Sequence, residues 1–532
     1  MLLLPVGNTS GESMESWDVV VVGSGIAALR SAIAASDAGA TVTVIESGGP
    51  GNAQSKTCST GFAVSVSESD HIQHRNNTFS AGHGLSNSKI VDQRCSSALD
   101  NLIQLERWGF NFQRNESGSP HASDSIGHSS PRLCSAGDST GREILRILEE
   151  QCMKRGIPRK YDLHSLSISV ESQRVRGIVV LDVQTGVITS IQAKSIILAT
   201  QDHSGLWNDE GGNGLGASLA LSAGAKLRGM EFVSWHPLCV PTSNYRLPIS
   251  LLAVGARIRK SNGDDVELSG SMTEAAISLM DGEYVLDARN VSASERDWFT
   301  TTANILASRF GIDLWKEVIP IQSQPDFTIG GVAVDHKGRA LLSSDLWLTG
   351  LYAAGGSADS GMHGADTIPG NRTLDDLIGG SNAGHSAANW SKSVGFGSQD
   401  ILHEMALVSE DFVESLSDLE TGSSVGANIA TLRRLMNSNM GLERDATMIS
   451  TCTAKIEEMI KEKVLLSDES FVMNTELIRA LELRGMLTLA RTVASTAEAR
   501  EETRGSHRRT DYPDLDDKHS ESLVVDVVSA CN

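Results

Sequence analysis

Residues 23–28 read GSGIAA and combine small side chains with a spacing that suits phosphate binding. Gly23, Gly25 and Ala28 fit the pattern GxGxxA, and an acid, Glu46, follows about 20 residues later. In such a turn the glycines permit a tight bend and the close approach of a pyrophosphate, while the acid accepts hydrogen bonds from a ribose. The spacing predicts a dinucleotide site whose contacts are Gly23, Ser24, Gly25, Ala27, Ala28 and Glu46. It does not by itself distinguish FAD from NAD.

The segments around this turn are those that a dinucleotide site needs. Residues 19–22 are consecutive valines, which is typical of a strand buried on both faces. An alanine-rich helix follows and ends at Gly39, and a second apolar strand, 41–45, ends at Glu46. This order is a βαβ unit with its phosphate-binding turn after the first strand. The Gly- and Ser-rich residues 47–70 are predicted as a loop.

The next part of the chain is expected to be rich in strands. Apolar residues recur at helical spacing in 90–112, the polar segment 113–137 is predicted as a surface loop, and a helix follows Ser139. Four strands are then predicted, at 165–170, 176–183, 187–192 and 193–200, with a hairpin turn at 184–186. A β-meander after a GxGxxA turn favours a two-nucleotide FAD-binding domain, because an NAD-binding domain more often repeats βαβ units.

The length and composition of the chain limit the number of domains and the kinds of partner that we expect. The chain has 532 residues, enough for about two to four domains. Lys and Arg number 45 against 66 Asp and Glu, and the net charge of −21 argues against nucleic acid or an anionic membrane as the main partner. No apolar run approaches the ~20 residues of a membrane span, and the expected location is the cytoplasm.

The cysteines and histidines show no pattern of a metal site. The seven cysteines are scattered and form no CxxC pair, so we expect neither a zinc nor an iron–sulfur site, and no disulfide framework. His121, His128 and His164 lack the spacing of metal ligands, and we interpret them as solvated loop residues.

Several motifs occur in the order found in one superfamily of flavoproteins. They are VVVVGSGIAALRSA (19–32), GHSSPRLCSAGDSTGREIL (127–145), SIILAT (195–200), GLYAAGGSADSGMHGA (350–365) and EETRGSHRRTDYPDLDD (501–517). With these motifs the chain resembles the flavoprotein subunits of succinate dehydrogenase and fumarate reductase, and most closely L-aspartate oxidase of the same superfamily. The resemblance implies an FAD-dependent oxidoreductase that acts on a small molecule. It allows an iron–sulfur partner subunit, which no motif in this sequence indicates.

The same resemblance implies an α/β fold in three parts. These are a split, two-nucleotide (Rossmann-like) FAD-binding domain at 17–232 and 326–398, an inserted α+β capping domain at 233–325, and a C-terminal helical domain at 401–515, with tails at 1–16 and 516–532. Helical spacing of apolar residues in 427–465 and 474–500 agrees with the last domain.

The resemblance also implies further contacts to FAD. The matching positions are Gly61, Ala199, Thr200, Asn213, Gly355 and Asn371. The histidine that carries covalent FAD in the respiratory members corresponds to a position near Gln54 in this chain. FAD is therefore expected to be non-covalent.

Most of the catalytic residues of the superfamily are absent. His236 matches one of its two substrate histidines, and Asp326 stands where the second is expected. A substrate arginine is replaced by Thr367, and the positions of the proton-transfer residues fall at Ile249, Leu252, and Gly270 or Ser271. In the aspartate oxidases a glutamate binds the amine of the substrate, and Ser125 stands at its position in this chain. A dicarboxylate needs guanidinium partners to offset its desolvation, so succinate, fumarate and aspartate are not expected as good substrates.

Two residues remain as candidates for catalysis, His236 and Asp326. His236 can equally be a packed, hydrogen-bonded histidine beside Trp235, while Asp326 can grip a substrate amine or act as a base. Arg257, Arg259 and Arg372 can compensate for the missing arginines, but we interpret them as ordinary surface charges.

Three functions are compatible with this pattern. The first is an FAD-dependent oxidoreductase with a diverged site, acting on a carboxylate or amino-acid-like substrate other than a simple dicarboxylate. The second is an L-aspartate oxidase with remodelled recognition, and the third is a non-catalytic FAD-binding scaffold. The sequence does not identify the substrate, the electron acceptor or the oligomeric state.

Overall fold

A mixed eight-stranded sheet is the central element of the computed structural model, which describes residues 14–49, 59–344, 346–417 and 422–526. In its middle, β1 (Ser16–Val22) lies parallel to β2 (Val42–Ile45) on one side and to β9 (Val187–Leu198) on the other. The valines of β1 are buried, as their run predicts. The other strands are β6 (Arg159–Lys160), β7 (Leu163–Glu171), β8 (Arg174–Asp182), β17 (Arg339–Leu341) and β18 (Trp347–Ala353).

The long strand β9 joins the two halves of this domain. Its first part pairs antiparallel with β8, and its second part pairs parallel with β18, which follows the inserted segment in the chain. The sequence predicted separate strands at 187–192 and 193–200, and this was wrong because no turn residue separates the buried Gln192 from Ala193.

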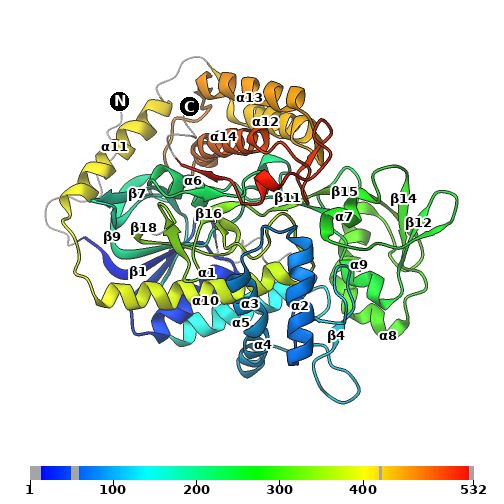
Figure 1. Ribbon diagram of the computed structural model, residues 1–532. Coiled ribbons are helices and arrows are strands. Elements are labelled where there is room, and N and C mark those ends of the chain that lie inside the picture. The colour runs from blue at the N-terminus through cyan, green and yellow to red at the C-terminus, as the bar shows by residue number, and fades with distance from the viewer. Residues whose placement is uncertain (1–13, 50–58, 345, 418–421, 527–532) are drawn as a thin grey trace.

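Helices α1 (Ile26–Asp37), α5 (Thr140–Lys154) and α10 (Asn371–Lys392) cover one face of the sheet (Figure 1). Two glycines of α10 let it approach α1 closely. A Cβ at Gly380 would lie 2.5 Å from the carbonyl oxygen of Ala27, and one at Gly384 would lie 2.2 Å from that of Ser31. This contact brings the N-termini of α1 and α10 to the same cavity.

Three further helices lie beside these, and two segments predicted as loops contain helix or strand. The described part of 47–70 is not all loop, since β3 (Phe62–Ala63) pairs with β5 (Leu133–Cys134), and α2 (Glu68–Ala81) begins after Ser67, whose side chain accepts from Asp70 N. The segment 113–137 contains β4 (Ala122–Ser123) and β5 and buries Arg132 completely. The predicted helical segment 90–112 forms α3 (Ser88–Ser96) and α4 (Ala98–Arg107).

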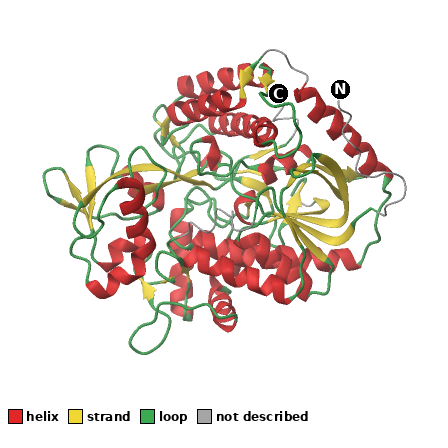
Figure 2. Ribbon diagram, turned by 180° about the vertical axis from the view of Figure 1, so that it is seen from behind, coloured by secondary structure: helices red, strands yellow, loops and turns green. Residues whose placement is uncertain are grey.

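The inserted segment forms a separate lobe at one end of the molecule (Figures 1 and 2). We call it the cap. Its five strands have the order β11 (Val233–Cys239), β15 (Val318–Thr328), β14 (Tyr284–Asp287), β12 (Arg257–Lys260), β13 (Asp265–Val266). Its helical elements include η3 (Ile249–Val254), α7 (Met272–Ile277), α8 (Ala293–Arg296), α9 (Thr300–Ile305) and the π-helical η5 (Leu306–Phe310). The antiparallel pair β11–β15 forms the connection between the cap and the main domain.

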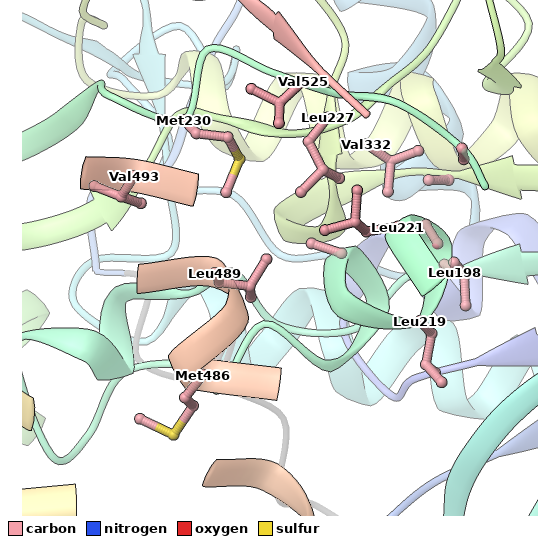
Figure 3. Packing of buried hydrophobic residues seen from close by; sticks show 14 of the residues in the cluster. Leu198, Leu219, Leu221, Leu227, Met230, Val332, Met486, Leu489, Val493 and Val525 are labelled. Carbon is pink, nitrogen blue, oxygen red and sulfur yellow. The ribbon is translucent and has the colours of Figure 1, made fainter. Parts of the chain in front are cut away.

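Helices α11 (Asp400–Ser417), α12 (Val425–Asn439), α13 (Ala446–Lys461) and α14 (Thr475–Ala499) follow α10 in the chain. In Figure 3, Met486, Leu489 and Val493 of α14 lie in one cluster with Leu219 and Leu221 of α6 (Leu215–Ser222). The cluster continues to a four-stranded sheet with the order β19 (Ala358–Asp359), β16 (Gly331–Ala333), β10 (Leu227–Arg228), β24 (Val524–Val525).

The described part of the predicted tail 516–532, up to residue 526, packs against the rest of the chain. Val524 and Val525 pair with Arg228 and Leu227, and the Arg500 guanidinium donates to the carbonyl of Glu521. The sequence offers only the short apolar run Leu523–Val525 there, and its partner strand lies about 300 residues away in the chain, so the pairing has no local signal. Among the described residues, no helix is both long and apolar enough to cross a membrane.

Candidate active site

Two cavities meet where α1 and α10 begin. The first, which we call the cofactor cavity, follows the β1–α1 turn and the ends of β2 and β9. The second, which we call the inner cavity, lies between that turn, the start of α10 and the β11–β15 pair of the cap. Ile26, Arg372 and Asp376 line both cavities, so the two are neighbours.

The cofactor cavity contains most of the residues that the sequence predicted for it. They are Gly23, Ser24, Gly25, Ala27, Glu46, Ala199, Thr200 and Asn213. Gly23 has a φ of +127°, which suits glycine. Helix α1 begins after Gly25 without a side-chain cap or an acid in its first turn. Its first backbone N–H groups are thus available for an anion such as a pyrophosphate.

Glu46 has the environment expected of a residue that binds a ribose. Its Oε1 accepts from Arg159 Nε at 3.0 Å, while Oε2 is buried and has no hydrogen-bond partner among the described residues. Burial raises the pKa of Glu46, although Arg159 acts in the opposite direction. A hydroxyl in the cofactor cavity would satisfy Oε2. The structure therefore fits the adenosine half of a dinucleotide.

Four predicted contacts lie elsewhere. Ala28 is buried in helix packing, and Gly355 lies behind the cavity wall, where a Cβ would be 2.7 Å from that of Ala27. The Asn371 side chain points to α2, where it bonds His74 Nε2 at 2.8 Å and donates to Thr78 Oγ1 at 2.9 Å. Gly61 lines the inner cavity instead.

Several residues of the cofactor cavity were not predicted from the sequence, among them Gly356, Asp376 and Glu482. Glu482 belongs to α14 and accepts from Asn213 Nδ2 at 2.7 Å, a contact across the chain that no local pattern signals. Asp376 follows Arg372 by one helical turn on α10, and this spacing could have identified it. Burial raises the pKa of Asp376 to about 7.

Both predicted catalytic residues line the inner cavity because their strands are paired. In the β11–β15 ladder His236 lies opposite Gln324, two residues before Asp326. His236 Nδ1 accepts the backbone N–H of Leu238 at 3.1 Å, and burial lowers the pKa of His236 to about 4. The neutral ring then carries its proton on Nε2. His236 is thus both a packed histidine and a potential hydrogen-bond donor, but not a base at neutral pH.

Asp326 and Arg246 form an ion pair at the cap side of the inner cavity. Asp326 Oδ1 lies 2.8 Å from Arg246 Nε, and Arg246 Nη2 also donates to the carbonyl of Asp326 at 2.8 Å. Sequence reasoning missed Arg246, since the fold of the cap brings it beside β15.

Arg372 is not an ordinary surface charge, which corrects one of the three interpretations made from the sequence. Its guanidinium lies 3.1 Å from the buried Asp202 Oδ2 and 4.3 Å from the centre of the Phe327 ring, at the junction of the two cavities. Arg257 is 60% exposed and pairs with Asp265, as a surface charge does. Arg259 pairs with Asp265 and with the buried Asp287.

The positions of the absent proton-transfer residues lie outside the inner cavity. Ile249, Leu252 and Gly270 line a separate cleft between the cap and the main domain, together with Ser125, which stands at the position of the amine-binding glutamate. Ser271 instead caps α7, with Glu274 completing a capping box. No residue at these positions can replace the proton relay of the superfamily.

Two of the three histidines interpreted as solvated are not. His164 is buried in β7, and burial lowers its pKa to about 4. His128 Nε2 lies 2.8 Å from the carbonyl oxygen of Pro369, and burial lowers its pKa to about 3. Their neighbours come from distant segments, so local polarity misled the interpretation.

Comparisons with known proteins identify the family of this chain. A family model described as an FAD binding domain matches residues 18–373, and one described as the C-terminal part of fumarate reductase flavoprotein matches 429–526. The fumarate reductase flavoprotein subunit of Mycobacterium tuberculosis is 28% identical over 94% of this chain and 93% of its own length. The succinate dehydrogenase flavoprotein subunit of Rickettsia bellii is 25% identical over 94% and 91%.

A solved structure of FrdA from E. coli quinol fumarate reductase, in a mutated form, superposes with a TM-score of 0.88 at 25% identity, covering 95% of this chain and 94% of that one. These findings confirm the predicted fold class and FAD as the cofactor, whereas the predicted closeness to L-aspartate oxidase is not shown. The position near Gln54 lies outside the described residues. The chain belongs to the succinate dehydrogenase and fumarate reductase flavoprotein superfamily of FAD-dependent oxidoreductases.

Proposed function

We propose that this protein oxidises a small molecule that carries one carboxylate and one amine-type cation, rather than a simple dicarboxylate. The observation that carries the proposal is the charge balance of the inner cavity. Its two guanidinium groups each face a carboxylate, Arg246 at Asp326 and Arg372 at Asp202. Asp376 adds a further carboxyl group.

This balance disfavours a substrate with two carboxylates. A second carboxylate would displace one of the existing ion pairs or enter without a counter-charge, and losing a buried charge pair costs about 2–5 kcal/mol. At the position of a superfamily arginine, Thr367 offers only a hydroxyl group. We expect the specificity constant for succinate to be lower than that of a working enzyme by a factor on the order of 10³ or more.

The residues of the inner cavity suit a zwitterionic substrate. Asp326 can hold the cation, Arg372 can hold the carboxylate over the Phe327 ring, and His236 Nε2 can donate to an oxygen atom. Residues of the cofactor cavity would hold FAD non-covalently, with the pyrophosphate at the start of α1 and the ribose at Glu46. When bound, FAD supplies the hydride acceptor.

Succinate–fumarate interconversion is the second candidate, because relatives with that activity in their names align with nearly the whole chain. One experiment separates the two. Anaerobic stopped-flow absorbance would follow flavin reduction by succinate, L-aspartate, L-alanine, β-alanine, sarcosine and glycolate, and reoxidation of the reduced protein by fumarate. We expect reduction by an amino acid with one carboxylate and negligible rates with succinate, aspartate and fumarate. Fast reduction by succinate or fast reoxidation by fumarate would replace the proposal by the second candidate.

Asp326→Asn is the matched variant for this assay. It should weaken the binding of the amine-bearing substrate by about 10-fold or more, because an amide cannot pair with a cation as a carboxylate does. A variant that keeps full affinity for this substrate would contradict the role of Asp326. A protein that no compound reduces, although it is yellow, would favour the non-catalytic scaffold.

A further inference from the structure

A hydroxyl, an imidazole and a carboxylate form a chain that begins in the inner cavity. Thr367 lines the cavity, and its Oγ1 lies 2.9 Å from His363 Nδ1. On the other side of the ring, His363 Nε2 lies 3.8 Å from Asp375 Oδ2. All three side chains are buried, with residue exposures of 3%, 9% and 8%.

The carboxylate at the end of this chain is held in its charged form. Asp375 Oδ1 accepts from Arg94 Nε at 2.6 Å, and Asp375 Oδ2 accepts from Ser360 Oγ at 2.7 Å. Burial acts to raise the pKa of Asp375, but Arg94, His363 and these hydrogen bonds together hold it below the ordinary value. A negative charge therefore faces His363 Nε2.

That charge sets the tautomer of His363. The Nε2–H form points its proton at Asp375, which leaves Nδ1 as an acceptor for the Thr367 hydroxyl. Burial lowers the pKa of His363, so its resting ring is neutral. The Thr367 hydroxyl has two acceptors in reach, His363 Nδ1 at 2.9 Å and the carbonyl of Ile368 at 3.4 Å. Donation along the shorter contact, to the unprotonated nitrogen, is the arrangement of a hydroxyl poised to lose its proton.

A two-electron oxidation needs such a group. The substrate loses a hydride with two electrons and, in addition, one proton from an O–H, N–H or adjacent C–H bond. Few other described residues of the inner cavity can act as a base. His236 Nδ1 already accepts the N–H of Leu238, and Asp326 is paired with Arg246. Asp376 is the remaining competitor, at the boundary with the cofactor cavity.

We propose that Thr367 is the catalytic residue that takes the substrate proton, with His363 and Asp375 as positioning residues that receive and stabilise it. The substrate's X–H bond breaks as a new Oγ1–H bond forms, and the original hydroxyl proton passes to His363 Nδ1. The result is an imidazolium beside the Asp375 carboxylate, while the hydride, which carries both electrons, is transferred to FAD. This inference rests on the proposed function, because it uses the same cavity and the same oxidation.

The test compares Thr367→Val, which keeps the shape and removes the hydroxyl, with Thr367→Ser, which keeps the hydroxyl. Both FAD-loaded proteins would be mixed anaerobically with the panel member that reduces the wild type fastest. We expect Thr367→Val to lower the rate of flavin reduction by about 10²–10⁴-fold. The Kd of the panel member, read from the flavin spectrum, should change by less than about 3-fold, and Thr367→Ser should stay within about 10-fold of the wild-type rate. The solvent deuterium isotope effect on the Val variant should increase, because proton transfer becomes the slow step.

Three results of this assay would overturn the inference while leaving the proposed function intact. The first is a wild-type rate of flavin reduction in Thr367→Val. The second is an equal loss of this rate in the Ser and Val variants. The third is a loss of about 10²–10⁴-fold in Asp376→Asn but not in Thr367→Val. A measurement independent of substrate covers the case in which no panel compound reduces the flavin. In protein labelled with ¹⁵N-histidine, with His363→Gln to assign the signal, His363 should be in the Nε2–H form and its Nδ1 signal should shift in Thr367→Val. A proton found on Nδ1 would overturn the relay.

Discussion

At the scale of single residues, Gly25 is a position where a side chain would obstruct the expected pyrophosphate site. It caps the start of α1 and lines the cofactor cavity. In Gly25→Val, the added atoms would occupy the path of the pyrophosphate, and overpacking of this kind costs about 1–3 kcal/mol before any contact to the cofactor is lost. We expect FAD affinity to fall on the order of 10²-fold or more. Gly426→Val is the matched control, because Gly426 lies in α12 with open space around it.

Equilibrium titration with FAD, followed by the quenching of flavin fluorescence, would measure both variants. Circular dichroism of the FAD-free proteins would show that each has folded. Unchanged FAD affinity in Gly25→Val would mean that the pyrophosphate lies elsewhere.

The sequence predicted the roles of some residues and not of others. The difference depends on how far apart along the chain a residue and its partners lie. Glu46 was predicted because the βαβ unit is local and its spacing is fixed by one strand, one helix and one turn. Arg246, Asp202 and Glu482 were missed, since each reaches its cavity or its partner through contacts between distant segments. Arg372 was taken for a surface charge because nothing near it in the sequence shows that the neighbouring Phe327 and Asp202 lie beside it.

At the scale of elements, helix α7 attaches the cap to the main domain through Asp366. Asp366 is completely buried, and its Oδ2 accepts the backbone N–H of Thr273 at 2.9 Å. Burial raises the pKa of Asp366 from the ordinary 3.8 to about 6. A folded-state pKa above the unfolded one means that the folded protein binds a proton more readily. Stability from this group therefore increases as pH falls from about 6 to about 4.

The upward shift in the pKa of Asp366 predicts how the substitution Asp366→Asn changes the stability of the protein. The amide keeps an acceptor oxygen and removes the buried charge, so at pH 8 the variant should be more stable than the wild type, by at most about 3 kcal/mol. The advantage should shrink between pH 6 and pH 4, where the wild-type carboxyl becomes neutral. Thermal denaturation at pH 8 and pH 4.5 would measure it. A variant that is less stable at pH 8 would show that the attraction between the carboxylate and the α7 N–H groups outweighs the cost of burial.

At the scale of the whole molecule, a buried charge cluster holds the C-terminal segment on the main domain. Glu231, Arg500 and Glu502 are each 0% exposed, and Arg500 lies 2.7 Å from both carboxylates. Removing one partner of a buried pair leaves an uncompensated charge, which costs about 3–5 kcal/mol. We expect Glu231→Ala to lower Tm by several degrees. Glu143→Ala breaks an exposed pair with Arg146 and should cost less than about 1 kcal/mol. Equal Tm values for the two variants would mean that Glu502 alone is enough to balance the buried charge of Arg500.

The order of strands in the two sheets has a consequence for biosynthesis. The main sheet lacks β18 until the whole cap has been translated, and the small sheet lacks β24 until Val524 and Val525 have been translated. The cap, by contrast, is one uninterrupted stretch of chain with its own apolar cluster. On the ribosome the inserted cap can therefore fold before the domain that surrounds it. The edge of β9 stays open meanwhile, and at about 5–20 residues per second the nascent chain exposes it for several seconds. The start of α10 lines the cavity, so FAD can be enclosed only after residues 371–376 have left the ribosome. Cofactor binding therefore follows the synthesis of most of the FAD-binding domain.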